Sequence, residues 1–352
     1  MKNRPRRHSG LVAALLLAAC QRTQPAALRP APPAPARDAA APQQSTPAAA
    51  PTRRAPDVAT RPFRVERAAA VGPAKVFAVS DERLWHVVDG AWSELPLDGA
   101  SVRDVSAVLG TIWVLTRGGN DNLGHVTVLR SSGADDLTVA WDVVTAPTHE
   151  PRALAVVSDH EFYVGGENPT LLRARYAGSL QTSATTLPAP VLGLLYMPDQ
   201  MMAVTYSDGR VGMFRWGEVN PVGRPDYLFS FSGVRESLMV RRDGAVWRGR
   251  VWEQPIETDR LSSASGIVPI AAATLRDESV VEVDAEHRSR LLRDGRWGDV
   301  EVSDPPGEVV GLFGARSLTQ GMAVMVDRDG GVFELVNARW VRTVAAATGR
   351  LR

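Results

Sequence analysis

One turn recurs three times along the chain, as VDGAW at 88–92, RDGRW at 293–297 and VNARW at 336–340. Each copy has Asp or Asn, then Gly or Ala, one variable residue, and then Trp. Asp-Gly and Asn-x pairs tolerate the positive φ angles of a tight hairpin, so the Trp is expected to lie at the start of the returning strand. The three turns therefore predict hairpins of one kind in distant parts of the sequence.

Short apolar runs surround these turns and are separated by Asp-Gly, Gly-Gly, Pro and Ser. Examples are KVFAVS at 75–80, RLWHVV at 83–88 and TIWVLT at 111–116. Such runs are typical of β-strands, and no part of 63–352 keeps the 3.6-residue apolar rhythm of a helix over three turns. We therefore expect residues 63–352 to be all-β.

Large aromatic residues recur at an average spacing of about 41 residues, at Trp92, Trp141, Tyr176, Trp216, Trp252, Trp297 and Trp340. A period near 40 with several strands per unit indicates a β-propeller, and 63–352 has room for seven blades. Runs such as VFAV at 76–79 and LAVV at 154–157 are expected to form the innermost strands. The pattern is weakest at 227–240, so six or eight blades are the alternatives. The motifs match no specific propeller family.

Two further expectations concern the geometry of this ring. Trp92, Trp297 and Trp340 should occupy equivalent positions in their blades, because they follow equivalent turns. A strand near 63–66 should pair with the last blade, because a closed ring leaves no long inner edge.

The start of the chain has the build of a secretory signal peptide. A basic segment at 2–7 precedes an apolar stretch at 11–19, far shorter than the ~20 residues of a membrane-spanning helix. LAAC at 17–20 resembles the lipobox of bacterial lipoproteins. The resemblance implies cleavage between Ala19 and Cys20 and acylation of Cys20, the only cysteine of the chain. An ordinary cleaved signal peptide is the alternative.

We therefore divide the chain into a lipoprotein signal peptide at 1–19, an acylated Cys20 with its linker at 20–62, and a β-propeller domain at 63–352. Of the 42 residues at 21–62, 23 are Ala or Pro. Such a segment buries too little apolar surface to offset its ordering entropy, so a disordered linker is expected. At ~3.1 Å per residue it would reach on the order of 100 Å.

Charge and motifs give little support for catalysis or for nucleic acid binding. Without residues 1–19, 36 Lys and Arg stand against 39 Asp and Glu, so a polyanion partner is not expected. No two histidines have the i, i+4 spacing of a metal site, and no serine elbow or phosphate loop occurs. Two loops, at 118–125 and 327–331, offer oxygen ligands without the full calcium set. We predict no catalytic residue, metal or cofactor.

The sequence favours a non-catalytic binding or scaffold module for a protein or an envelope polymer. An exported propeller enzyme of the glycosidase or lyase type and a ligand sensor are the alternatives. Contacts are expected in the loops at 117–125, 145–152 and 220–226, with these candidate binding residues: Asn120, Asp121, Asn122, His149, Glu150 and Arg224. The lipoprotein resemblance implies a membrane anchor in the bacterial envelope. Gln21, in place of Asp, favours the outer membrane, facing the periplasm or the cell surface.

Overall fold

The computed structural model describes residues 63–347 except 98–99, 109, 119–123, 132–136, 146–149, 159, 198–200, 209, 216–217, 222–226, 232–236, 250–256 and 316. The predicted signal peptide and linker therefore lie outside the described residues. Regular structure in the described residues is entirely β-strand, as the sequence predicted. Within this part of the chain, no helix has the length and apolar character needed to cross a membrane.

The described strands follow one another in seven groups of four. Groups 1 to 3 contain β1 (Arg67–Gly72), β2 (Lys75–Ser80), β3 (Arg83–Val88), β4 (Ala91–Leu95), β5 (Ser101–Val108), β6 (Thr111–Gly118), β7 (Gly124–Ser131), β8 (Leu137–Thr145), β9 (Pro151–Ser158), β10 (Glu161–Gly166), β11 (Thr170–Tyr176) and β12 (Leu180–Thr186). Groups 4 and 5 contain β13 (Val191–Met197), β14 (Met201–Tyr206), β15 (Val211–Arg215), β16 (Glu218–Pro221), β17 (Tyr227–Phe231), β18 (Ser237–Arg241), β19 (Val246–Gly249) and β20 (Glu257–Arg260). Groups 6 and 7 contain β21 (Pro269–Thr274), β22 (Val280–Asp284), β23 (Ser289–Arg293), β24 (Arg296–Val302), β25 (Val309–Phe313), β26 (Val324–Asp327), β27 (Val332–Val336) and β28 (Arg339–Val344).

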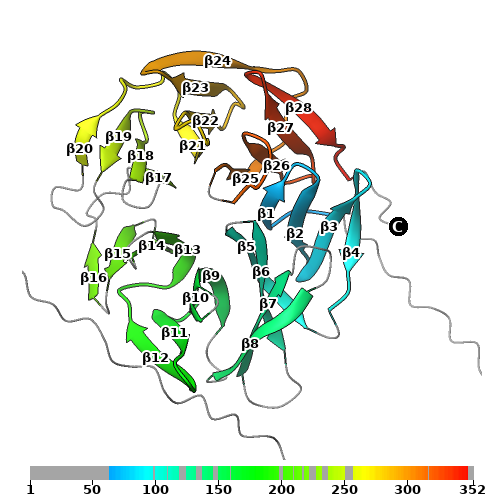
Figure 1. Cartoon of the computed structure of the whole chain (residues 1–352), viewed down its shortest axis with the longest axis vertical. Helices are drawn as coiled ribbons and strands as arrows, with labels where there is room; N and C mark the ends of the chain where they lie inside the picture. The colour runs from blue at the N-terminus through cyan, green and yellow to red at the C-terminus, as the bar shows by residue number, and fades with distance from the viewer. Residues whose placement is uncertain are drawn as a thin grey trace, which may run out of the picture. The chain divides into compact units, whose positions relative to one another are not determined.

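Each group forms an antiparallel sheet in chain order, and the sheets surround a common centre (Figure 1). The first strand of each group is innermost and the fourth is outermost. Groups 6 and 7 join in one eight-stranded sheet, because β24 pairs in parallel with β28 at Glu301↔Arg339 and Val302↔Trp340. This radial repetition of four-stranded sheets is a β-propeller. The blade count stays the sequence-based prediction of seven.

Strand direction defines two regions that matter below. The starts of the first strands and the turns between second and third strands gather around one end of the centre, which we call the channel mouth. The turns between third and fourth strands lie at the periphery, and we call them the outer hairpins.

The three repeated turns are outer hairpins of groups 1, 6 and 7. Their central residues all have positive φ, from 50° at Asp294 to 75° at Gly90, as a two-residue hairpin requires. Even Ala338, which is not a glycine, has a positive φ of 57°. The following Trp is the second residue of the fourth strand in every case, so the predicted equivalence is confirmed.

The three indoles also share a bonding pattern. The Trp92 Nε1–H donates to the Gly330 carbonyl at 2.7 Å, and that of Trp340 donates to Ser289 Oγ at 3.0 Å. The Trp297 Nε1–H donates to the Ser263 carbonyl at 3.0 Å. Each acceptor lies in the group, or in the link, that precedes the Trp around the ring. The repeated Trp therefore joins its own blade to the preceding one.

The aromatic residues of the periodic series given above do not all occupy the same position in their blades. Trp141 lies in β8, a fourth strand, but Tyr176 ends β11, a third strand, and is 52% exposed. The fourth strand of that group, β12, has the sequence LQTSATT, without an aromatic residue, and is largely exposed. Trp216 and Trp252 lie outside the described residues. The sequence of β1 also corrects a prediction, since VFAV at 76–79 lies in β2 and the innermost strand is the preceding Ala-rich segment.

The ring does not close through the predicted strand pairing. Residues 63–66 form no strand, because the last sheet is already complete with β25 to β28. Instead the Val65 N–H donates to the Arg328 carbonyl at 2.8 Å. Phe63 and Val65 are buried in the core between groups 7 and 1, where the Phe63 ring lies 5.2 Å from that of Trp85. Closure is therefore mainly a matter of packing.

Candidate functional site

A charged pocket of about 470 Å³ lies at the channel mouth, where groups 1, 2 and 3 meet. It is formed by the starts of β1, β5 and β9 and by the turns that follow β2 and β10. Its charged lining consists of five carboxylates and three guanidinium groups, from Glu66, Asp81, Glu82, Glu150, Glu167, Arg67, Arg103 and Arg152. Buried Val102 and Pro151 support the wall beneath them.

Ion pairs organise this pocket across the blade boundaries. Arg103 of β5 lies 2.5 Å from Glu82 of group 1 and 3.9 Å from Glu150, atom to atom. Glu150 also pairs with Arg117, at the end of β6. A hydrogen bond from Ser101 Oγ, helped by the charge of Arg103, lowers the pKa of Glu82. Glu82 is therefore held in the ionised form.

A second pair, Arg152 with Glu167, lies within group 3. Both side chains are about half exposed, so this pair contributes only ~0–1 kcal/mol to stability. Solvent and partners can reach it.

Arg67 connects the pocket to the rest of the mouth. Its Nη2 donates to the Leu192 carbonyl of group 4 at 3.4 Å, and its Nε lies 4.0 Å from Asp104 of group 2. Asp104 accepts hydrogen bonds from the N–H groups of Val105 and Leu154, each at 2.9 Å. Burial nevertheless raises the pKa of Asp104 to about 6. This carboxyl therefore titrates in mildly acidic solution.

An apolar cavity of about 240 Å³ lies along the centre of the ring. First strands of six groups line it, mostly with Ala, Val and Leu. Small residues such as Ala68 and Ala155 allow these strands to approach the axis closely. Three hydroxyl side chains, those of Ser106, Thr274 and Ser317, are also part of its described lining.

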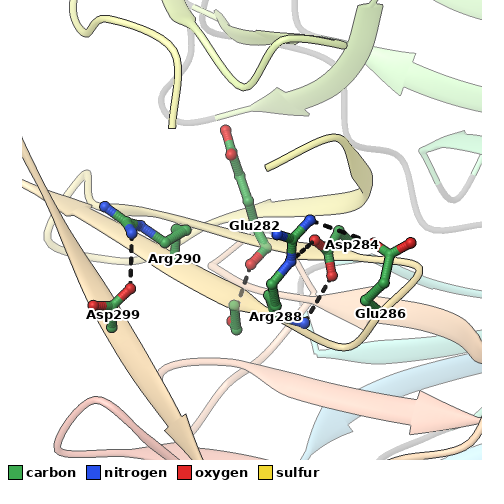
Figure 2. Close-up of polar contacts among 7 residues, drawn as sticks. Glu282, Asp284, Glu286, Arg288, Arg290 and Asp299 are labelled. Atoms are coloured by element: carbon green, nitrogen blue, oxygen red, sulfur yellow. Dashed lines mark hydrogen bonds and ion pairs between the residues drawn. The ribbon is translucent and has the colours of Figure 1, made fainter. Parts of the chain in front are cut away.

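Glu282 is a buried acid that sequence reasoning missed. It lies on β22, is fully buried, and its two carboxylate oxygens make no hydrogen bond with any described residue. Figure 2 shows its carboxyl pointing away from the neighbouring ion pairs of Arg288 with Asp284 and of Arg290 with Asp299. Burial raises the pKa of Glu282 to about 8, with a smaller contribution from Asp243, so the group is neutral at pH 7.

An aromatic groove of about 320 Å³ lies at the periphery between groups 2 and 3. Trp141 and Asp142 of β8 form one side, and His160, Tyr176 and Leu180 form the other. Because its Tyr176 and Leu180 are exposed, this groove is a second candidate binding surface.

Of the predicted binding residues, Glu150 is described, and it lies in the charged pocket. The other predicted site residues lie outside the described residues: Ala19, Cys20, Asn120, Asp121, Asn122, His149 and Arg224. The three predicted contact loops join strand ends at the channel mouth, because they connect β6 to β7, β8 to β9 and β16 to β17. Their binding role stays a prediction.

Six charged residues of the pocket were not predicted from the sequence, namely Glu66, Arg67, Asp81, Glu82, Arg103 and Glu167, whereas Arg152 ends the predicted contact loop at 145–152. The available signal was an Arg near the start of successive innermost strands, next to acidic turns. In the part of the chain that the structure describes, no cluster of three or more His, Cys, Asp or Glu could hold a metal ion. Asp327, considered above as an oxygen ligand, is buried and accepts hydrogen bonds from Gly331 N at 2.6 Å and Gly307 N at 2.9 Å.

No protein-family model and no curated protein sequence matches this chain. Solved structures do. PorZ, described as an essential bacterial surface component of the type-IX secretion system of Porphyromonas gingivalis, is 15% identical with a TM-score of 0.53, over 82% of this chain and 39% of PorZ. This chain therefore spans well under half of PorZ.

Two structures of YCF48 are also similar. YCF48 bound to D1 peptide is 13% identical with a TM-score of 0.51, over 82% of this chain and 94% of that one. YCF48 from Cyanidioschyzon merolae is 11% identical with a TM-score of 0.53, over 75% of this chain and 92% of that one. At these identities the likeness is one of fold, and the fold of this chain is that of the β-propeller proteins.

Proposed function

We propose that this chain is a lipid-anchored protein of the bacterial envelope whose seven-bladed propeller binds a protein partner at the channel mouth without catalysing a reaction. The observation that carries the proposal is the 470 Å³ charged pocket, in which ion pairs cross two blade boundaries. A pocket at the loop-bearing end of a rigid ring is well placed for recognition.

The state of the pocket's charges favours binding over proton transfer. General acid–base catalysis works best with a group whose pKa lies near the working pH. Glu82 instead has a lowered pKa and, like Glu150 and Glu167, is held by an arginine. Glu282 and Asp104, whose pKa values are raised to about 8 and about 6, do not line this pocket.

The structural neighbours support a protein partner in an envelope setting. PorZ is a bacterial surface component of a secretion system, and one YCF48 structure contains a bound peptide. The lipobox-like LAAC at 17–20 supports acylation at Cys20, after cleavage behind Ala19. The Ala/Pro-rich linker would hold the propeller at a distance from an outer membrane.

A site-specific photo-crosslinking experiment tests the binding face. A photoreactive residue is placed at Glu150 in the pocket or, as a control, at Asp89 in an outer hairpin of the acylated full chain. After illumination of the native envelope, we expect the same protein to crosslink from position 150 in repeated experiments and not from position 89. Crosslinks from position 89 alone would overturn the proposed face.

The anchor is tested separately by Cys20→Ser and fractionation of the envelope. We expect the variant to leave the membrane fraction. Membrane retention in the original amount would show that acylation of Cys20 does not hold the protein.

A further inference from the structure

The first strands of five groups share a β-bulge near the channel mouth. In each, one residue has no partner on the second strand, and these residues are Arg103, Arg152, Leu192, Ile270 and Val310. A bulge leaves the extra residue out of the ladder and changes the direction of its side chain. The same position of the first strand is therefore left out of the strand pairing in five groups.

In group 1 the register shift lies at Val71, near the other end of β1, and the residue beside the mouth is Glu66, just before the first strand pair. It follows the buried Val65 and precedes Arg67, which pairs with Val79. The Glu66 N–H donates to the Val79 carbonyl at 2.8 Å, next to that pair. Glu66 is exposed and lines the charged pocket.

Burial confirms that most of these side chains leave the protein interior. The residues just before four of the five bulge residues are buried, with Val102 and Val191 at 2% and 0% exposed, whereas Val309 is only partly buried. Leu192 and Ile270, by contrast, are 39% and 43% exposed. Large apolar side chains at such exposure need an explanation only when they gather, and these belong to one structural position around one opening.

The bulge residues and Glu66 divide the mouth into two sectors. Groups 1, 2 and 3 place Glu66, Arg103 and Arg152 there, which we call the charged sector. Groups 4 and 6 place the exposed Leu192 and Ile270 there, which we call the apolar sector, and Val268 beside the strand of Ile270 is 63% exposed. Val310 of group 7 instead packs against the core between groups 7 and 1. In Figure 1 the inner strands β1, β5 and β9 lie next to one another, whereas β13 and β21 lie in the rest of the ring with β17 between them.

The charged sector favours a cation. Five carboxylates line its pocket against three guanidinium groups, or four with Arg117, which pairs with Glu150 from β6. All three lining arginines already have an acidic neighbour. Arg103 pairs with Glu82, Arg152 with Glu167, and Arg67 lies beside Asp104. An incoming anion would meet excess negative charge, whereas an incoming Lys or Arg would relieve it.

We propose that the channel mouth binds an extended segment of a protein partner that places Lys or Arg on the charged sector and an aliphatic side chain on the apolar sector. The bulge residues determine this specificity. The inference rests on the proposed binding function and adds the chemistry of the bound segment.

The test uses the full chain as its Cys20→Ser variant and three labelled twelve-residue peptides. The first peptide carries Lys at one end and Leu at the other, the second has Glu for Lys, and the third has Ser for Leu. By fluorescence anisotropy at low salt, we expect the Lys-Leu peptide to bind at least tenfold more tightly than the Glu peptide. Its affinity should fall as salt is raised.

Matched variants locate the effect. Leu192→Ser with Ile270→Ser should weaken the Lys-Leu peptide at least fivefold and leave the Ser peptide unchanged. The control is Val336→Ser with Val341→Ser, at an outer hairpin, where the side chains are equally exposed at 41% and 42%. Equal binding of the Glu peptide, or an equal loss in the control, would overturn the two-sector inference. Crosslinking from position 150 would still stand in that case, so the two proposals fail separately.

Discussion

The outer hairpins and the channel mouth are both built from repeated positions, but the two regions treat those positions differently. At three outer hairpins the second residue of the fourth strand is always Trp. Its indole N–H always donates to a segment that precedes its own blade around the ring. At the mouth, the bulge position holds Arg, Leu, Ile or Val. A position that repeats its residue fixes the packing between blades, whereas a position that varies its residue is free to serve recognition. Substitutions at the outer hairpins should therefore mainly lower stability, whereas substitutions at the channel mouth should mainly change binding specificity.

The largest effect is expected at the best-buried outer hairpin. Trp340 is 1% exposed and belongs to the core between groups 6 and 7. Trp340→Ala removes that packing and leaves Ser289 Oγ without its donor, so we expect a loss of about 3–5 kcal/mol in the free energy of unfolding. Urea denaturation measures it. Trp297→Ala is the matched control, and its half-buried ring should cost clearly less; equal losses would contradict the dependence on burial.

Ring closure should be the next most sensitive feature. Phe63 is buried against Trp85 and Trp92, with ring centroids 5.2 and 5.4 Å apart. Phe63→Ala should cost about 3 kcal/mol, because it opens a cavity between groups 7 and 1. Phe63→Leu keeps most of the volume and should cost about 1 kcal/mol. If thermal unfolding shows no loss for Phe63→Ala, packing at this seam does not close the ring.

The pH dependence of stability should report on Glu282, which belongs to neither repeated pattern. Its folded-state pKa is about 8, above the usual 4.5, so between these values the folded protein retains a proton that the unfolded chain has lost. Stability should therefore fall as pH rises, by at most about 1.4 kcal/mol per unit, and level off above pH 8. Asp104 acts in the same direction only up to about pH 6.

Glu282→Gln isolates this effect above pH 6. The amide cannot ionise, so the melting temperature of the variant should be nearly constant between pH 6 and 8 while that of the original protein falls. The charged groups that influence Glu282 are Asp243 and Arg290, and both are unchanged in the variant. Parallel curves for the two proteins would show that Glu282 is not the titrating group.

The sequence predicted the outer hairpins well and the mouth poorly, for a physical reason. Asp89-Gly90 and its relatives encode positive φ locally, so their strands and the role of Trp92 can be recognised from five residues. Arg103 and Arg152 meet Glu82 and Glu167 only because separate strands and turns converge there. Bulges depend on the partner strand and leave no local signal. Glu282 is likewise buried against other segments, because Gly244 and Ser265 lie close to its carboxyl.

The smallest effect on stability, and the sharpest test of the separation, is expected at the mouth itself. Arg152 is about half exposed and pairs with the equally exposed Glu167, and Leu192 is already partly in water. Arg152→Gln and Leu192→Ser should each change the free energy of unfolding by no more than about 0.5 kcal/mol, because they remove little buried surface. The same Leu192→Ser change is part of the pair expected to weaken the Lys-Leu peptide. A loss above 2 kcal/mol in urea denaturation would mean that the bulge residues hold the blades together, and the division between a packing region and a recognition region would then be wrong.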